Sequence, residues 1–485
     1  MNVAKAVPAG TPIVGDNAEI DWSRIDTGLQ YEGKAIKLPG EPGEMPIPAA
    51  IQVLERIAEA EAQVYAAHEV VHGIPWDALV AVYRALESIY GVILPQSAMS
   101  FFGPKPPSFL TIKTGPHDAD CVQVPVGKML LPGMKTPVHV GIARDGCHIS
   151  GEVNKKDQAR LLEVAIKARG LLKTQSICRG KALIIPVDDD GILSMNEQPE
   201  FMDLASVTEE SLIHNELTRR IIETSIFCPI RHAAACRKHG IPLKRGILLE
   251  GRYGCGKSLT ARVTAKICEE SGWTFILISR AQGLKAALDM AKLYEPCVVF
   301  AEDLDRFGDR SSEEVNDLIN LLDGAVPAKA AIMTILTTNH IELIDKALLR
   351  PGRLDAVISI DAPDAPTVEK LVRYYAGPLL PGTEDVGPVG ERMAGQIPAS
   401  IAEIVKRSKL AMIYDGRERL LGDDLVTAAE TAMRHLALLE DKRPEPSTGE
   451  KLAESLIHLV ADGVARHGQV GELVDEMAQH RVATE

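Results

Sequence analysis

The residues best suited to chemistry lie at positions 251–258, which read Gly-Arg-Tyr-Gly-Cys-Gly-Lys-Ser directly after the apolar run 246–249. This is the pattern G-x-x-x-x-G-K-[ST] in the strand-loop-helix setting that a phosphate-binding loop requires. Its glycines let successive backbone N–H groups point at phosphate oxygens, and the following helix adds its positive N-terminal end. We expect Lys257 to reach the β and γ phosphates and the Ser258 hydroxyl to ligate Mg²⁺.

Two later segments place polar side chains at the ends of apolar strands. Residues 297–301 form an apolar run that ends in Glu302 and Asp303, and residues 332–336 form another that leads to Asn339. Acids at the carboxyl end of a buried strand, beside a phosphate loop, are suited to holding Mg²⁺ and polarising a water. We assign Glu302 to the Mg²⁺ shell and Asp303 to water activation, while the Asn339 amide is placed to orient the attacking water. A slow nucleotide switch remains the alternative to productive hydrolysis.

A cationic segment follows at residues 347–355, Ala-Leu-Leu-Arg-Pro-Gly-Arg-Leu-Asp. It presents Arg350 and Arg353 on either side of a stiff Pro-Gly turn. The planar guanidinium fork stabilises the spreading charge of a phosphoryl transition state, so both arginines are candidates for that role.

Together these segments resemble the AAA branch of the AAA+ ATPases over residues 200–435. The matching stretches are 201–205, 246–258, 298–305, 321–324, 338–339 and 347–355. The resemblance implies a homo-oligomeric ring, usually a hexamer, in which ATP with Mg²⁺ sits between neighbouring subunits. It also implies that Arg350 and Arg353 are arginine fingers for the next subunit and that Asn339 is the sensor of the γ-phosphate or lytic water.

The same resemblance implies the residues that contact the nucleotide. Leu204 and Ala205 match the segment that flanks adenine, and Ala399 lies at the start of a lid helix near the ribose. The full set is Leu204, Ala205, Gly251, Tyr253, Gly254, Cys255, Gly256, Lys257, Ser258, Leu259 and Ala399.

Two features depart from the family pattern. The acids occur in the order Glu302-Asp303 rather than Asp-Glu, an order similar to that of the mitochondrial AAA translocase involved in respiratory-complex assembly. In addition, residues 279–285 carry no aromatic at the position of the usual pore loop and lead almost directly into a helix at 286–294. We therefore expect whole-domain pushing or gating of a protein partner rather than threading by an aromatic pore loop.

Composition narrows the class of partner. The chain has 485 residues, a formal charge of −14 and only 4% aromatic residues. Its length predicts several domains, and its charge and scarcity of stacking side chains weigh against nucleic acid. A nucleic-acid remodelling or replication ATPase and a nucleotide-dependent scaffold with little turnover remain alternatives. The cysteines lack a C-x-x-C pair, and neither a bilayer-spanning apolar run nor a signal-peptide core is evident, so we expect a cytoplasmic protein with no membrane partner.

The predicted fold class is α/β: a P-loop AAA+ parallel sheet with a helical lid, preceded by a separate mixed α/β domain and followed by a helical tail. In the mixed domain, residues 48–91 read as helical with a break at 73–75, and 182–187 as its last strand. That domain would recruit an unknown protein substrate. The predicted divisions are an irregular arm (1–47), the mixed domain (48–187), an acidic linker (188–200), the large nucleotide-binding domain (201–363), the lid (364–440) and the tail (441–485).

Overall fold

The structure is a computed structural model that describes residues 30–32, 35–38, 43–100, 103–187, 197–302, 304, 327, 329–344 and 354–440. Most of the predicted arm, all of the predicted tail, and the candidate residues Asp303, Arg350 and Arg353 lie outside these ranges. The chain divides into two compact units, Met1–Asp361 and Ala362–Glu485. None of the helices in the described ranges is long and apolar enough to cross a bilayer.

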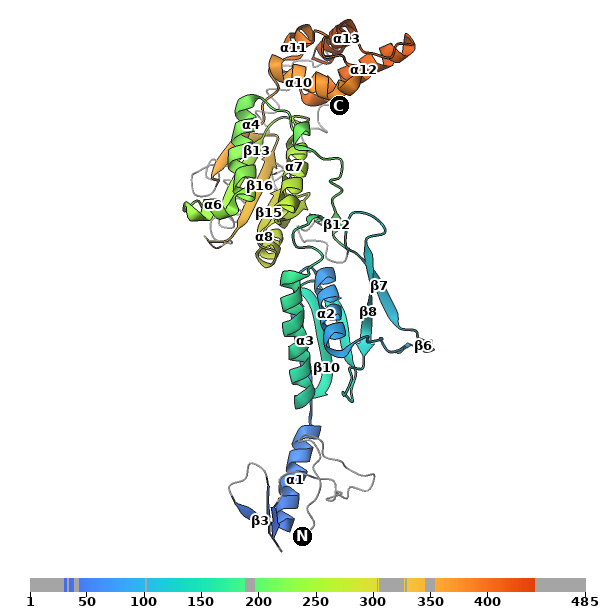
Figure 1. The fold of residues 1–485 in the computed structure, drawn as a ribbon, viewed down its shortest axis with the longest axis vertical. Helices are drawn as coiled ribbons and strands as arrows, with labels where there is room; N and C mark the ends of the chain where they lie inside the picture. The colour runs from blue at the N-terminus through green and yellow to red at the C-terminus, as the bar shows by residue number, and fades with distance from the viewer. Residues whose placement is uncertain are drawn as a thin grey trace, which may run out of the picture. The chain divides into compact units, whose positions relative to one another are not determined.

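The candidate site belongs to a seven-stranded sheet with the order β12-β11-β14-β15-β16-β13-β17. In that order the strands are Glu200–Phe201, Ala182–Ile185, Thr274–Ile278, Cys297–Ala301, Ile332–Thr338, Arg245–Glu250 and Ala356–Ser359. All neighbours pair in parallel except β12, which pairs antiparallel with β11. Every residue of β15 is buried, as expected for a central strand covered on both faces. The predicted parallel α/β sheet is thus present (Figure 1).

Helices accompany this sheet. Those before β13 are α4 (Glu216–Ile222), the π-helical turn η3 (Glu223–Phe227), α5 (Cys228–Arg231) and α6 (Ala233–Lys238). After the phosphate loop and β14 come α7 (Lys257–Glu270) and α8 (Leu284–Leu293), which Figure 1 shows alongside the strands. The short 3₁₀ turns are η2 (Glu209–Ser211), η4 (Ala281–Gly283) and η6 (Ile341–Leu343).

The N-terminal part forms a five-stranded antiparallel sheet with the order β4-β10-β9-β8-β7. Its strands are β4 (Val64–His72), β7 (Ser108–Lys113), β8 (Cys121–Met129), β9 (Val138–Ala143) and β10 (Gly146–Asn154). It contacts α2 (Pro75–Tyr90) and α3 (Lys155–Thr174). We call this sheet with its two helices the N-terminal layer. Smaller pieces are β1 (Gln30–Glu32), β2 (Ala35–Lys37), β3 (Glu44–Pro46), α1 (Ile47–Ala62), β5 (Ala98–Ser100) and β6 (Gly103–Lys105).

The helical prediction for residues 48–91 is wrong at Val64–His72, which form β4. Only α1 and α2 are helices, whereas β4 lies between them and pairs with β10 over its whole length. Val71 on β4 is fully buried and its neighbour His72 is exposed, as the alternation of side chains in a strand requires. The strand exists because of a partner about 80 residues later in the chain, which local periodicity does not reveal.

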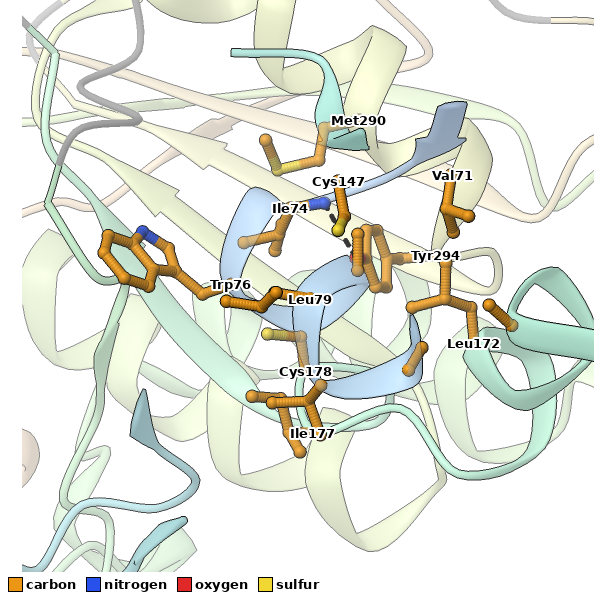
Figure 2. Packing of buried hydrophobic residues seen from close by; sticks show 14 of the residues in the cluster. Val71, Ile74, Trp76, Leu79, Cys147, Leu172, Ile177, Cys178, Met290 and Tyr294 are labelled. Carbon is orange, nitrogen blue, oxygen red and sulfur yellow. Dashed lines mark hydrogen bonds between the residues drawn. The ribbon is translucent and has the colours of Figure 1, made fainter. Parts of the chain in front are cut away.

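The N-terminal layer shares one hydrophobic cluster with the parallel sheet. The cluster includes Leu79 from α2, Ile149 from β10 and Val299 from β15. Figure 2 shows how Tyr294, at the end of α8, packs among residues of the N-terminal layer such as Ile74 and Leu172. The strand β11, assigned from the sequence to the N-terminal domain, pairs with β14 inside the seven-stranded sheet, so the predicted boundary after residue 187 separates strands of one sheet.

Hydrogen bonds, two of them buried, join the same two parts. The Tyr294 hydroxyl accepts from the Ile74 N–H (2.9 Å) and donates to Asp77 Oδ2 (3.0 Å), and Asp77 is only 1% exposed. Arg179 donates to the backbone carbonyls of Leu293 (2.5 Å) and Glu295 (2.6 Å). The N-terminal layer is therefore joined to the turn that precedes β15.

The second unit is helical as far as it is described. It contains α10 (Ala365–Ala376), the 3₁₀ turn η7 (Gly377–Leu379), α11 (Gly387–Met393), α12 (Pro398–Tyr414) and α13 (Gly422–Glu440). The Asp364 side chain accepts from the Thr367 N–H (3.0 Å) and so caps α10. Ala399 lies in the first turn of α12.

Candidate nucleotide-binding site

The loop between β13 and α7 has a backbone that only glycine adopts easily. Gly254 and Gly256 have φ values of 78° and 104°, in the left-handed region. A Cβ at Gly251 would lie 2.7 Å from the Ile360 carbonyl oxygen, closer than packed atoms tolerate. Gly256 directly precedes α7, so the loop delivers its N–H groups at a helix N-terminus, where an anion is stabilised.

Lys257 and Asn339 are brought together at this loop. The Lys257 ammonium donates to Asn339 Oδ1 (2.7 Å) and to the carbonyl oxygens of Gly251 (2.5 Å) and Arg252 (3.1 Å). Asn339 directly follows β16, which is the parallel neighbour of β13, so both side chains project from the same edge of the sheet. A cation and a neutral amide are thus placed together beside the phosphate loop.

Ser258 and Glu302 form a second pair. Ser258 Oγ donates to Glu302 Oε1 at 2.9 Å, and Glu302 directly follows β15. A hydroxyl oxygen beside a carboxylate is an oxygen donor set of the kind that Mg²⁺ prefers. The residues present therefore fit the metal that the sequence predicted.

The other predicted contact residues differ in exposure. Tyr253 is 64% exposed, with its ring centroid 6.5 Å from that of His340. Cys255 is 2% exposed, and burial raises the pKa of its thiol, so it packs in the loop as a neutral group. Leu204 is buried, whereas Ala205 is exposed and donates its N–H to Asp203 Oδ1 (3.0 Å). Leu259 is half-buried in the first turn of α7.

One residue beside the loop was not predicted from the sequence. His214 is 7% exposed, and a Cβ at Gly256 would lie 3.2 Å from its Cε1 atom. Its Nε2 atom is buried without a hydrogen-bond partner in the described part of the chain. Burial lowers the pKa of this imidazole to about 4, so the ring is neutral at pH 7. A lone histidine outside any motif gave no signal in the sequence.

A histidine cluster in the N-terminal layer also carries titratable groups. Residues 68–72 read H-E-V-V-H, the spacing that binds zinc when both histidines lie on one face of a helix. Here the segment is in β4, where positions i and i+4 are about 13 Å apart, against about 5–6 Å between Cβ atoms on a helix. His68 Nε2 is instead 2.8 Å from His148 Nδ1, and His148 Nε2 is 2.6 Å from Asp145 Oδ1. That hydrogen bond lowers the pKa of the Asp145 carboxyl.

This cluster is not arranged as a metal centre. Among the residues that the structure describes, no group of three or more His, Cys, Asp or Glu side chains is arranged to hold a metal ion. The β-strand setting of the H-E-x-x-H segment gives the physical reason, since each imidazole meets a different partner on or beside β10.

Comparison with known proteins agrees with the geometry of the loop. Residues 247–362 match the family described as "ATPase family associated with various cellular activities (AAA)". The ATP-dependent zinc metalloprotease FtsH of Thermus thermophilus is 28% identical over 261 residues, which cover 49% of this chain and 40% of that protein. An FtsH of Synechocystis is 28% identical over 262 residues (48% and 41%), and one of Sorangium cellulosum is 32% identical over 237 residues (44% and 38%). The chain thus spans about two fifths of the length of these relatives.

Proposed function

From its AAA ATPase domain, an ATP-hydrolysing domain that uses ATP with Mg²⁺, we propose that this chain hydrolyses ATP in order to remodel or move a protein partner. The observation that carries the proposal is the convergence of two polar pairs beside the phosphate loop, Lys257 with Asn339 and Ser258 with Glu302. Together they supply a cation, a water-orienting amide and metal ligands at one edge of the sheet.

The roles of these residues follow from their chemistry. The Lys257 ammonium exchanges a backbone carbonyl for the phosphate oxygens, and the Asn339 amide orients the water that attacks the γ-phosphate. Ser258 and Glu302 would hold Mg²⁺, which when bound would supply positive charge to the phosphates. Asp303, next to Glu302 in sequence, takes the proton of the attacking water. In the proposed ring, Arg350 and Arg353 of one subunit reach the nucleotide of its neighbour.

The proposed assembly is a homo-oligomeric ring, with a hexamer as the expected size. Its relatives are named as ATP-dependent zinc metalloproteases, but we do not extend proteolysis to this chain, because its H-E-x-x-H segment lies in a β-strand. The segment before α8 has no aromatic side chain, which supports displacement of a folded partner rather than threading. The N-terminal layer, whose core is shared with the ATPase sheet, is the proposed recruiting surface.

Binding and turnover measured on the full chain test this proposal. Lys257→Ala should abolish ATP binding in calorimetry, whereas Lys238→Ala, which removes an exposed lysine of α6, should leave the dissociation constant unchanged. Mass photometry with ATP and Mg²⁺ should show a single oligomer, with the mass of a hexamer as the expected result. If Lys257→Ala binds ATP as tightly as the wild type, the proposed site is wrong. ATPase stimulation by DNA or RNA with a steep salt dependence would instead favour a nucleic-acid machine.

A further inference from the structure

The buried imidazole of His214 lacks an explanation in the fold. Side chains that are buried and polar almost always have a hydrogen-bond partner, because leaving one unpaired is destabilising. Nε2 of His214 has none in the described part of the chain, although the residue is only 7% exposed. Such an atom is a candidate contact for a ligand.

The ring lies against the phosphate loop. Its Cε1 and Nε2 atoms would be 3.2 and 3.9 Å from a Cβ at Gly256, so this edge of the imidazole faces the loop residue that precedes α7. The segment that carries His214 is also attached further along α7, because Arg262 donates to the Asp203 carbonyl oxygen (3.1 Å). Residues 203–214 therefore flank the loop and the first turns of α7.

The hydrogen-bonding groups of the His214 ring indicate which part of a nucleotide it contacts. Burial keeps His214 neutral, because it lowers the pKa of the imidazole to about 4. The phosphate charge is already met by Lys257 and by the N–H groups at the start of α7. A neutral imidazole has one donor and one acceptor nitrogen, and a base edge offers partners for both, whereas phosphate oxygens only accept. That description fits a nucleobase.

We propose that His214 Nε2 hydrogen-bonds the base edge of a bound adenine nucleotide and thereby selects the base. This inference rests on the proposed function, since it places the nucleoside beside residues 203–214 once the phosphates occupy the loop. If the Nε2 atom accepts, its partner is the N6 amino group; if it donates, its partner is a ring nitrogen such as N7.

Calorimetry on the full chain with Mg²⁺ tests the contact with three probes: ATP, purine riboside triphosphate, which lacks the amino group, and 7-deaza-ATP, which lacks N7. The wild type should bind one of the two analogues about tenfold more weakly than ATP, the effect of one hydrogen bond of about 1.4 kcal/mol. In His214→Phe, which keeps a ring but removes the polar atom, that difference should disappear.

Two further measurements keep a structural role apart from recognition. Thermal melts should show that His214→Phe and His214→Asn remain folded, and His232→Ala, an exposed histidine between α5 and α6, should keep the tenfold difference. Equal binding of all three nucleotides by the wild type, or an equal loss for all three in both His214 variants, would overturn the inference. A wild type that binds no nucleotide at all would instead overturn the proposed function.

Discussion

Removing the Tyr294 hydroxyl should destabilise the first unit by about 2.5–6 kcal/mol. In Tyr294→Phe the buried Ile74 N–H loses its acceptor, which costs about 1–3 kcal/mol. Asp77 also loses one of its donors, and a hydrogen bond to a charged group contributes about 1.5–3 kcal/mol. Asp77 keeps the Ser176 hydroxyl (2.5 Å) and the Ile177 N–H (2.9 Å), so the loss stays below that of a wholly unpaired carboxylate. Against a typical stability of about 5–15 kcal/mol, this is a large fraction.

Tryptophan fluorescence during urea unfolding measures this effect in both parts of the unit. Trp76 is the second residue of α2 and is 8% exposed, while Trp273 directly precedes β14 and is 2% exposed. Two variants are needed, both with Trp22 replaced: one keeps Trp76 and the other keeps Trp273. The fluorescence of the first then reports unfolding of the N-terminal layer, and that of the second reports unfolding of the parallel sheet. Because both parts share a core, the two transitions should coincide, and Tyr294→Phe should lower both by the same free energy.

Tyr65→Phe is the matched control, because that hydroxyl is on a 40% exposed residue and donates to Gln63 Oε1. It should change stability by less than about 0.5 kcal/mol. The shared core would be refuted if the two single-tryptophan variants unfolded at different urea concentrations. It would also be refuted if Tyr294→Phe lowered the stability reported by one tryptophan and not by the other.

Three other outcomes follow from the site and from this core. Ser258→Ala and Glu302→Gln should each reduce Mg²⁺-dependent hydrolysis about 10–100-fold. Because both residues serve one ion, the fold loss in the double variant should be smaller than the product of the two single-variant losses. Asp303→Asn should bind ATP normally yet lose about 10²-fold or more in turnover, and a turnover equal to wild type would exclude its role as the base. Burial raises the Asp77 pKa above 3.8, so between pH 3.8 and that raised value the folded state holds more protons than the unfolded state. The free energy of unfolding, measured by urea titration, should therefore fall as pH rises through this window, relative to that of Asp77→Asn. A difference between the two proteins that does not change with pH would contradict the raised pKa of Asp77.

The sequence predicted the elements whose signal is local. Residues 297–301 are a short apolar run followed by acids, and they form β15 with the same bounds. The apolar run 246–249 likewise lies within β13. In both cases the run of apolar or alternating side chains ends at polar residues or a turn, so neighbouring residues determine the element.

Of the elements defined by distant partners, β4 was missed, and β11 was predicted as a strand but assigned to the N-terminal domain. β4 lies between two helices and is a strand because β10 pairs with it. β11 reads as the end of the N-terminal domain, but its neighbours are β14 and β12, which no sequence spacing indicates. His214 belongs to the same class, because its significance depends on burial against Gly256.

On the proposed function, the shared core determines how a change at the nucleotide reaches the partner. β15 carries Glu302 at one end, and the turn before its other end is held by Arg179 and Asp77. Packed interiors transmit strain and resist sliding. A displacement of β15 therefore moves the N-terminal layer with it, because the two do not slide past each other. The position of that layer thus depends on the nucleotide bound in its own subunit. A partner bound there would be moved as a whole, which agrees with the absence of an aromatic side chain at residues 279–285.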